Sequence, residues 1–399
     1  MIFTTYWFAV FAALLFALYW SVPSARIRMV LLTAACVIFH AHFAGPAGVI
    51  PVLVLGAITY AAGRSERRDA CTAGIVLCVL ALVFYKYTHF LCIQLLGWIS
   101  PALGAGALAA AQAVAPGVPP LAISFFTFEF VHYLYDVRKG GRGIRAPLDF
   151  TVFTLFFPSL VAGPIKRFQD FIPSLHAGLR SVTREDVIHG FARVVTGYVK
   201  KVLIADNLAA WSQFNVLHFH DLDVGRRWMV FAAIGFRLLL DFSGYSDIAI
   251  GLARMLGIRL PENFRWPYLA TNLQEFWQRW HISLSTWIRD YVYIPLGGSR
   301  HGKGRRIFNG AVAFSLCGLW HGADWNFVVW GLYHAAGLAF LQVLGARAGG
   351  QHAPRSSVRI FASWATTLLF VWIGWLFFFY PVSKALKLLL MLFGHAGLP

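Results

Sequence analysis

Long apolar stretches without Lys, Arg, Asp or Glu alternate along this chain with short polar segments. A membrane helix needs about 20 mostly apolar residues to cross a hydrocarbon core about 30 Å thick. The uncharged stretches of this length are 3–22, 29–63, 89–128, 325–346 and 361–380. The second and third are long enough for two passes each, with breaks expected at Gly45-Pro46 and at the group Pro116, Pro119 and Pro120. The pattern predicts a protein with many membrane passes.

Shorter apolar stretches are expected to form tilted, re-entrant or protein-buried helices around a cavity, because irregular backbone at membrane depth is tolerated only away from lipid. These stretches are 71–85, 150–165, 229–242 and 308–319. The first apolar stretch lacks a basic start and a small-residue cleavage site, which indicates a retained helix. We therefore expect an all-α polytopic membrane protein, 1–399 in one domain, with roughly eleven embedded helices around a central funnel or tunnel.

Composition excludes a soluble multi-domain enzyme. Hydrophobic residues make up 58% and charged residues 13%, against about 45–50% and about 25% in soluble domains. The 34 Lys and Arg exceed the 17 Asp and Glu, and the cations gather between apolar runs, as in cytoplasmic membrane loops rather than nucleic-acid surfaces. The clusters are Arg64/Arg67/Arg68, Arg138/Lys139/Arg142/Arg145, Lys166/Arg167, Lys200/Lys201 and Arg300/Lys303/Arg305/Arg306.

No metal or disulfide site is expected. The 5 cysteines form no CxxC pair and lie mostly in apolar stretches. His218, His220, Asp221 and Asp223 are types that ligate metals, but their segment is typical of a short loop outside the membrane.

The densest polar segment is 273–298, LQEFWQRWHISLSTWIRDYVYIPLGG. On a continuous helix it forms two stripes. One stripe contains Trp280, Leu284, Trp287 and Tyr291, and the other contains His281, Ser285 and Arg289. Such a helix either anchors in the membrane interface or lines a wet cavity.

A second candidate is His321 in LCGLWHGADWNFVVWG, between two apolar runs. An ionisable side chain among membrane helices is costly unless it faces a cavity or a partner, which makes it a functional candidate. Gly318 and Gly322 would let another backbone or a substrate approach closely. The alternative is a core histidine bonded to a neighbouring carbonyl.

The segment 241–247, DFSGYSD, places two carboxylates, two serines and a tyrosine between apolar runs. These groups must be satisfied internally or by water. They either line a tunnel or form a buried network that braces helices. The segment is not a GxSxG nucleophile elbow, because Ile248 stands where the second glycine belongs.

Five blocks in this sequence resemble the membrane-bound O-acyltransferases, in the bacterial branch of alginate O-acetyltransferases and teichoic acid D-alanine transferases. They are ISFFTFEFVHYLYDVRKG, LVAGPIKRFQDF, DFSGYSDIAIGLARMLGIRLPENF, FWQRWHISLSTWIRDYVYIPLGGSR and GLWHGADWNFVVWGLYH. The resemblance implies that His321 is catalytic and that His281 is its functional companion. DFSGYSD and LPENF are also family hallmarks, which we interpret as scaffold or tunnel wall.

The resemblance implies transfer of an acyl group from a thioester made in the cytoplasm to hydroxyls outside. A hydroxyl needs a base with a pKa near the working pH, and histidine at about 6.5 fits best. We expect His321 to accept the proton and His281 to orient the donor or polarise its carbonyl. Arg279 and Arg289 are expected to neutralise donor phosphate. The remaining candidate substrate-binding residues are Ser285, Asp241, Ser243 and Tyr245.

The expected donor is acetyl-CoA or an acyl carrier-protein thioester, with no bound cofactor. The expected partners are an extracytoplasmic acyltransferase, a glycan acceptor and membrane lipid, in the cytoplasmic (inner) membrane of a bacterium. Acetyl transfer to an exported polysaccharide is the first choice and D-alanyl transfer the second. A serine relay through Ser283 or Ser285 and a transporter that makes no bond are the alternatives.

Overall fold

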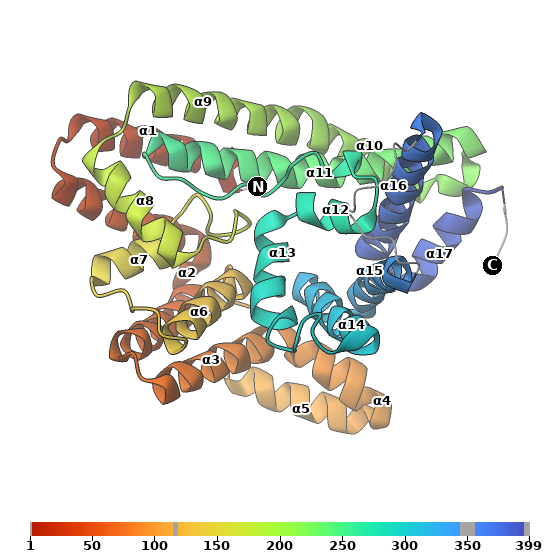
Figure 1. Ribbon diagram of the computed structural model, residues 1–399, viewed down its shortest axis with the longest axis horizontal. Helices are drawn as coiled ribbons and strands as arrows, with labels where there is room; N and C mark the ends of the chain where they lie inside the picture. The colour runs from red at the N-terminus through yellow and green to blue at the C-terminus, as the bar shows by residue number, and fades with distance from the viewer. Residues whose placement is uncertain (1, 115–118, 344–355, 395–399) are drawn as a thin grey trace. The chain divides into compact units, whose positions relative to one another are not determined.

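The structure is a computed structural model that describes residues 2–114, 119–343 and 356–394 (Figure 1). Helices dominate the described residues, and no strand occurs among them. The predicted all-α fold is therefore confirmed. Two compact units share the chain: 1–195 with 246–261, and 196–245 with 262–399. The organisation of 1–399 as one domain stays a prediction.

In the first unit α1 packs against α2 and α2 packs against α3. Helix α3 also lies alongside α6 (Figure 1). Its elements are η1 (Ile2–Thr4), α1 (Tyr6–Ser21), α2 (Ala25–Ser65), α3 (Arg68–Leu82), the π-helical η2 (Val83–Tyr87) and η3 (Phe90–Leu96), α4 (Gly97–Ile99), α5 (Pro101–Val114), α6 (Ile123–Arg138), α7 (Pro147–Leu155) and α8 (Phe168–Arg180). Helices α9 (Arg184–Tyr198) and α11 (Val224–Met255) contribute residues to both units.

The second unit holds the segments that the sequence analysis singled out for chemistry. Its elements are the π-helical η4 (Val199–Ala205), α10 (Asp206–Leu217), η5 (Phe219–Asp221), η6 (Pro267–Leu269), α12 (Leu273–Arg279), α13 (Ile282–Ile288), the π-helical η7 (Arg289–Tyr293), α14 (Gly302–His321), α15 (Trp325–Val343), α16 (Ser357–Phe379) and α17 (Val382–Met391). Helices α14 and α15 pack closely along their lengths.

Five helices of the described part are long and apolar enough to cross a membrane, which confirms a multi-pass membrane protein. They are Ala25–Ser65, Arg68–Tyr87, Val224–Met255, Trp325–Val343 and Ser357–Phe379. Shorter apolar helices cover Tyr6–Ser21, Phe90–Ile99 and Pro101–Val114. The expected total of about eleven embedded helices stays a prediction.

One predicted helix limit agrees with the structure and another differs. The stretch 29–63 lies in α2, where two helical parts meet at a kink: Gly45 leaves helical geometry, at φ 63° and ψ 172°. The break predicted at Gly45-Pro46 is therefore confirmed. The stretch 229–242, predicted to be short, is wrong as an element, because it belongs to the 32-residue α11. Of the predicted proline break, Pro116 lies outside the described residues.

A buried ion pair lies among aromatic rings in the first unit. The Lys166 ammonium, 1% exposed, donates to the Glu129 carboxylate and lies 5.2 Å from the ring centre of Phe153. Breaking such a pair leaves an uncompensated buried charge, which typically costs about 3–5 kcal/mol. Lys166 is therefore buried in protein, and the cytoplasmic location expected for the Lys166/Arg167 cluster stays a prediction.

Candidate active site

The polar segment 273–298 is not one continuous helix. Helices α12 and α13 are separated by Trp280 and His281, and the π-helical η7 follows α13. His281 has φ 42°, in the left-handed region that residues other than glycine seldom adopt. The predicted polar stripe is therefore wrong: His281 is 1% exposed, whereas Ser285 and Arg289 line a cavity.

The aromatic stripe predicted on the same segment is buried in protein. Trp280, Leu284 and Trp287 are each less than 10% exposed. These rings therefore do not anchor a helix in the membrane interface. Their burial fixes α12 and α13 against the rest of the second unit.

His281 is held at the helix break by a buried amide and by aromatic rings. Its Nδ1 lies 3.0 Å from Oδ1 of Asn263, a residue with no exposed surface. The Phe242 ring meets the imidazole edge-on, with ring centres 4.6 Å apart. Burial, and after it the nearby His321, lower the pKa of His281 well below its usual value. A neutral imidazole follows.

His321 is the last residue of α14, and its ring is half-buried. The ring centre lies 4.9 Å from Phe378, 5.2 Å from Trp330 and 4.6 Å from Trp320. The Trp320 ring also lies 6.0 Å from the His281 ring. The two candidate histidines are therefore brought to one aromatic cluster, although 40 residues separate them in the sequence.

The glycines beside His321 make the close approach predicted for them. A Cβ on Gly318 would lie 2.1 Å from the carbonyl oxygen of Phe327 in α15, and one on Gly322 would lie 2.0 Å from the Phe327 ring. A Cβ on Gly331 would lie 2.3 Å from the Phe314 carbonyl oxygen. Helices α14 and α15 therefore touch at backbone distance at the turn that carries His321.

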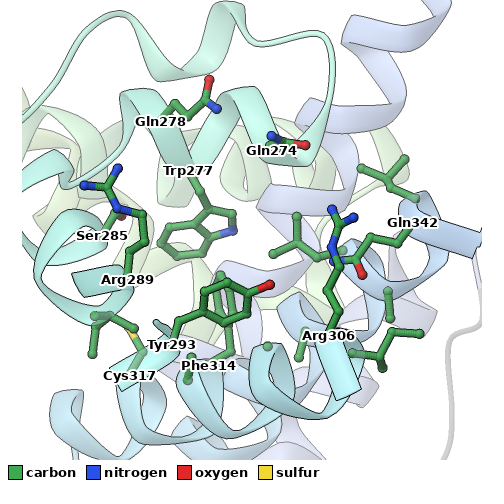
Figure 2. Close-up of a pocket in the computed structure, with 18 of the residues that line it drawn as sticks. Gln274, Trp277, Gln278, Ser285, Arg289, Tyr293, Arg306, Phe314, Cys317 and Gln342 are labelled. Carbon is green, nitrogen blue, oxygen red and sulfur yellow. The ribbon is translucent and has the colours of Figure 1, made fainter. Parts of the chain in front are cut away.

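A cavity of about 910 Å³ lies between α12, α13, η7, α14 and α15 (Figure 2). Ser285 and Arg289 line one side and Arg306 and Gln342 line the other, with Trp277 between them (Figure 2). Ligand pockets usually measure about 300–1,000 Å³. The cavity is therefore large enough for a small-molecule ligand.

Three cationic side chains line the cavity: Lys303 and Arg306 lie near the start of α14, and Arg289 lies on the opposite side (Figure 2). The Arg289 guanidinium donates to Asp290, at 2.7 and 3.2 Å. The side chains of Lys303 and Arg306 form no ion pair or hydrogen bond with any residue of the described part. The two cations therefore remain available to an anionic ligand.

Two residues in the wall of the cavity are close neighbours of the histidines, one beside His281 in the sequence and one a helical turn before His321. Cys317 lines the cavity, and His321 is four residues further along the same face of α14. Ile282 also lines the cavity and directly follows His281. Neither histidine lines the cavity itself. The arrangement places both imidazoles close to the part of the cavity wall formed by Ile282 and Cys317, away from Lys303 at the start of α14.

The other predicted substrate-binding residues do not line the cavity. Arg279 donates to Glu275 at 2.6 Å. Asp241 pairs with Lys201, which also pairs with Asp206. Ser243 and Tyr245 are buried in α11. The Asp241 pair fits the interpretation of DFSGYSD as a brace between helices, and substrate contacts by these residues stay predictions.

Ser285 lines the cavity, but its hydroxyl donates to the Trp280 carbonyl, 3.2 Å away.

Within the described ranges, no group of three or more His, Cys, Asp or Glu side chains is placed to hold a metal ion. In the loop segment His220 and Asp221 are paired and mostly exposed.

Sequence reasoning assigned no role to Trp277 and Gln342, which line the cavity, or to Asn263, which holds His281. Lys303 and Arg306 were recognised only as members of a basic cluster. The asparagine in the hallmark LPENF was the one available signal for the residue that holds His281, but the two residues lie 18 positions apart and meet only in the folded chain.

The chain is similar in sequence to several known acyltransferases. The chain is 36% identical over 379 residues to the probable alginate O-acetylase of Azotobacter vinelandii, covering 92% of this chain and 72% of that protein. It is 34% identical to the peptidoglycan O-acetyltransferase of Helicobacter pylori, over 70% of this chain and 57% of that protein. It is 30% identical to the teichoic acid D-alanyltransferase of Bacillus subtilis, over 54% and 57%.

The chain spans roughly half to three quarters of the length of these relatives. The family signature of membrane-bound O-acyltransferases matches residues 119–394. This range contains both histidines and every wall of the cavity. The chain therefore belongs to the membrane-bound O-acyltransferase family.

Proposed function

We propose that this protein transfers an acyl group from a cytoplasmic thioester to hydroxyls of an extracytoplasmic polysaccharide or cell-envelope glycan. Acetyl is the first choice of acyl group. The observation that carries the proposal is a cavity with two cations at one end that no described residue neutralises, and with the neutral His281 and the half-buried His321 next to the wall at the other end. By the positive-inside rule the basic segment 300–306 faces the cytoplasm. The proposed location is therefore the cytoplasmic membrane of a bacterium.

The donor enters at the cationic end. CoA and carrier-protein thioesters both carry phosphate, and Lys303 and Arg306 supply charge that no described residue neutralises. Such cations raise the local concentration of an anionic donor. The acyl thioester then reaches past Cys317 towards the histidine cluster.

The reaction needs one proton acceptor. The acceptor hydroxyl attacks the thioester carbonyl, the new C–O bond forms and the C–S bond breaks. Neutral His321 takes the hydroxyl proton and returns it to the leaving thiolate, so that the imidazole ends neutral. A positioned base of this kind contributes about 10²- to 10⁴-fold. His281 is the companion of His321 in this cluster.

An extracytoplasmic acyltransferase partner is proposed for the final transfer to polymer. D-alanyl transfer from a carrier-protein thioester is the second candidate, because a teichoic acid D-alanyltransferase is among the relatives. Acetyl is favoured because the alginate O-acetylase resemblance covers 92% of the chain at 36% identity, against 54% at 30%.

The test is thioester cleavage by the purified full chain in lipid vesicles. With labelled acetyl-CoA and a short hydroxyl acceptor such as alginate oligosaccharides, we expect free CoA thiol and a base-labile acetyl ester on that acceptor, whereas transfer onward to long polymer needs the partner. A transporter would instead move intact label without releasing thiol. Replacing acetyl-CoA by a D-alanyl carrier protein separates the two acyl donors.

Charge reversal at the cavity tests the donor site. Arg306→Glu is expected to raise the KM for acetyl-CoA about tenfold, a change of about 1.4 kcal/mol, with little change in kcat. Arg305→Glu is the matched control, because Arg305 is the next residue and does not line the cavity. Equal effects of the two variants would contradict a donor site at this end.

A further inference from the structure

Asn263 lies at the break between α12 and α13 and has no exposed surface. Its backbone carbonyl accepts from the Ile282 N–H at 2.9 Å. Two residues later, the Arg265 N–H donates to the Arg279 carbonyl, also at 2.9 Å. These bonds fasten the LPENF segment to both sides of His281 and fix where the Asn263 side chain points.

The side-chain oxygen of Asn263 faces three donors. The Ser283 N–H lies 3.3 Å from Oδ1 and the Ser283 hydroxyl 2.9 Å from it. A backbone N–H can only donate, so the atom that meets it must be the amide oxygen and not the amide nitrogen. His281 Nδ1, 3.0 Å from the same oxygen, must therefore carry a hydrogen.

The other ring nitrogen of His281 has the opposite character. A neutral imidazole holds one hydrogen, so with Nδ1 protonated Nε2 carries a lone pair. Nε2 is buried, and no hydrogen-bond partner for it occurs among the described residues. Phe242 and Trp320 cover the ring with aromatic surface, and His321 is the titratable neighbour. A buried acceptor without a hydrogen-bond partner costs free energy, and a hydrogen bond from a substrate group would remove that cost.

We propose that Asn263 is a positioning residue that holds His281 as the Nδ1–H tautomer, so that Nε2 accepts a hydrogen bond from a donor group of the bound substrates. This inference rests on the proposed acyl transfer. It changes the role of His281, because a bare Nε2 does not polarise the thioester carbonyl by donating to it. The proton removed from the attacking hydroxyl still passes to His321.

The test begins with the tautomer itself, which does not depend on any activity. The full chain, labelled with ¹⁵N-histidine, is examined by NMR in micelles, and the His281 signals are assigned by their loss in His281→Gln. We expect hydrogen on Nδ1 and none on Nε2 in the wild type. Hydrogen on Nε2 would overturn the proposal.

Two substitutions at Asn263 separate positioning from simple support. Asn263→Asp keeps an acceptor for all three donors. It is expected to preserve the tautomer and to retain most of the rate of acyl transfer. Asn263→Leu removes the acceptor, mixes the tautomers and is expected to lower kcat about 10- to 100-fold with the KM for acetyl-CoA unchanged. If Asn263→Leu does not fold, the wild-type and Asn263→Asp spectra still decide the tautomer.

Asn309→Leu is the matched control. Asn309 is equally buried, and its amide donates to the Gly298 carbonyl at 3.0 Å rather than to a histidine. It is expected to lower thermal stability without changing the His281 tautomer or kcat. A changed tautomer in Asn263→Leu with wild-type kcat would overturn the positioning role. An intact tautomer in a wild type that cleaves no thioester would instead refute the proposed function.

Discussion

His321→Ala is expected to abolish acyl transfer while leaving the protein folded in the membrane. The imidazole is half-buried at the end of α14, and α14 is held by backbone contacts at Gly318 and Gly331 that do not involve it. Removing a general base lowers the rate of the chemical step about 10²- to 10⁴-fold. Thiol release by purified protein and acetyl content of the exported glycan both measure the loss.

Two further histidine variants serve as controls for the loss of activity in His321→Ala. His321→Gln keeps a polar side chain but supplies no base, so it is expected to be as inactive as alanine, whereas a transporter would retain partial flux. His218→Ala removes an exposed histidine beyond α10 and is expected to behave as wild type. Wild-type acetylation by a well-expressed His321→Ala protein would refute the catalytic assignment.

Membrane helices could be predicted closely where the signal lies within one uninterrupted stretch. Residues 361–380 and 325–346 correspond to α16 and α15, with α15 described as far as Val343. Such helices need only about 20 apolar residues, which composition reveals directly. Helix α11 could not be predicted in the same way, because DFSGYSD interrupts its apolar run. The carboxylates are accommodated by cations from other segments: Asp241 pairs with Lys201, and Asp247 pairs with Arg193.

The candidate site was predictable as residues but not as geometry. His321 and His281 stand out as ionisable groups between apolar runs. The break at His281 was missed, because helical spacing assumes a continuous helix, and the bonds that stabilise the break come from Asn263 and Arg265. The cavity was expected as a funnel, but which cations line it depends on how α14 packs against α12 and α13, and local sequence does not contain that information.

The second large effect is expected from a single methyl group at Gly318. Its Cβ would lie 2.1 Å from the Phe327 carbonyl oxygen and 3.0 Å from the Phe327 carbonyl carbon, and a backbone group cannot rotate away as a side chain can. Gly318→Ala must therefore separate α14 from α15 in the turn that precedes His321. Overpacking of this kind costs about 1–3 kcal/mol and occasionally more. We expect a lower unfolding temperature in detergent and a large loss of thiol release, because the base is displaced.

Gly310→Ala makes the same substitution in the same helix with the opposite expected sign. No atom lies within 4 Å of a Cβ at Gly310, so the methyl group meets open space. Alanine is favoured over glycine inside a helix by about 0.5–1 kcal/mol, so this variant is expected to unfold at an equal or higher temperature than the wild type. The pair separates helix propensity from contact, since propensity alone would stabilise both variants. Equal unfolding temperatures for the two would show that α14 and α15 do not meet at Gly318, and the position of His321 would then need another support.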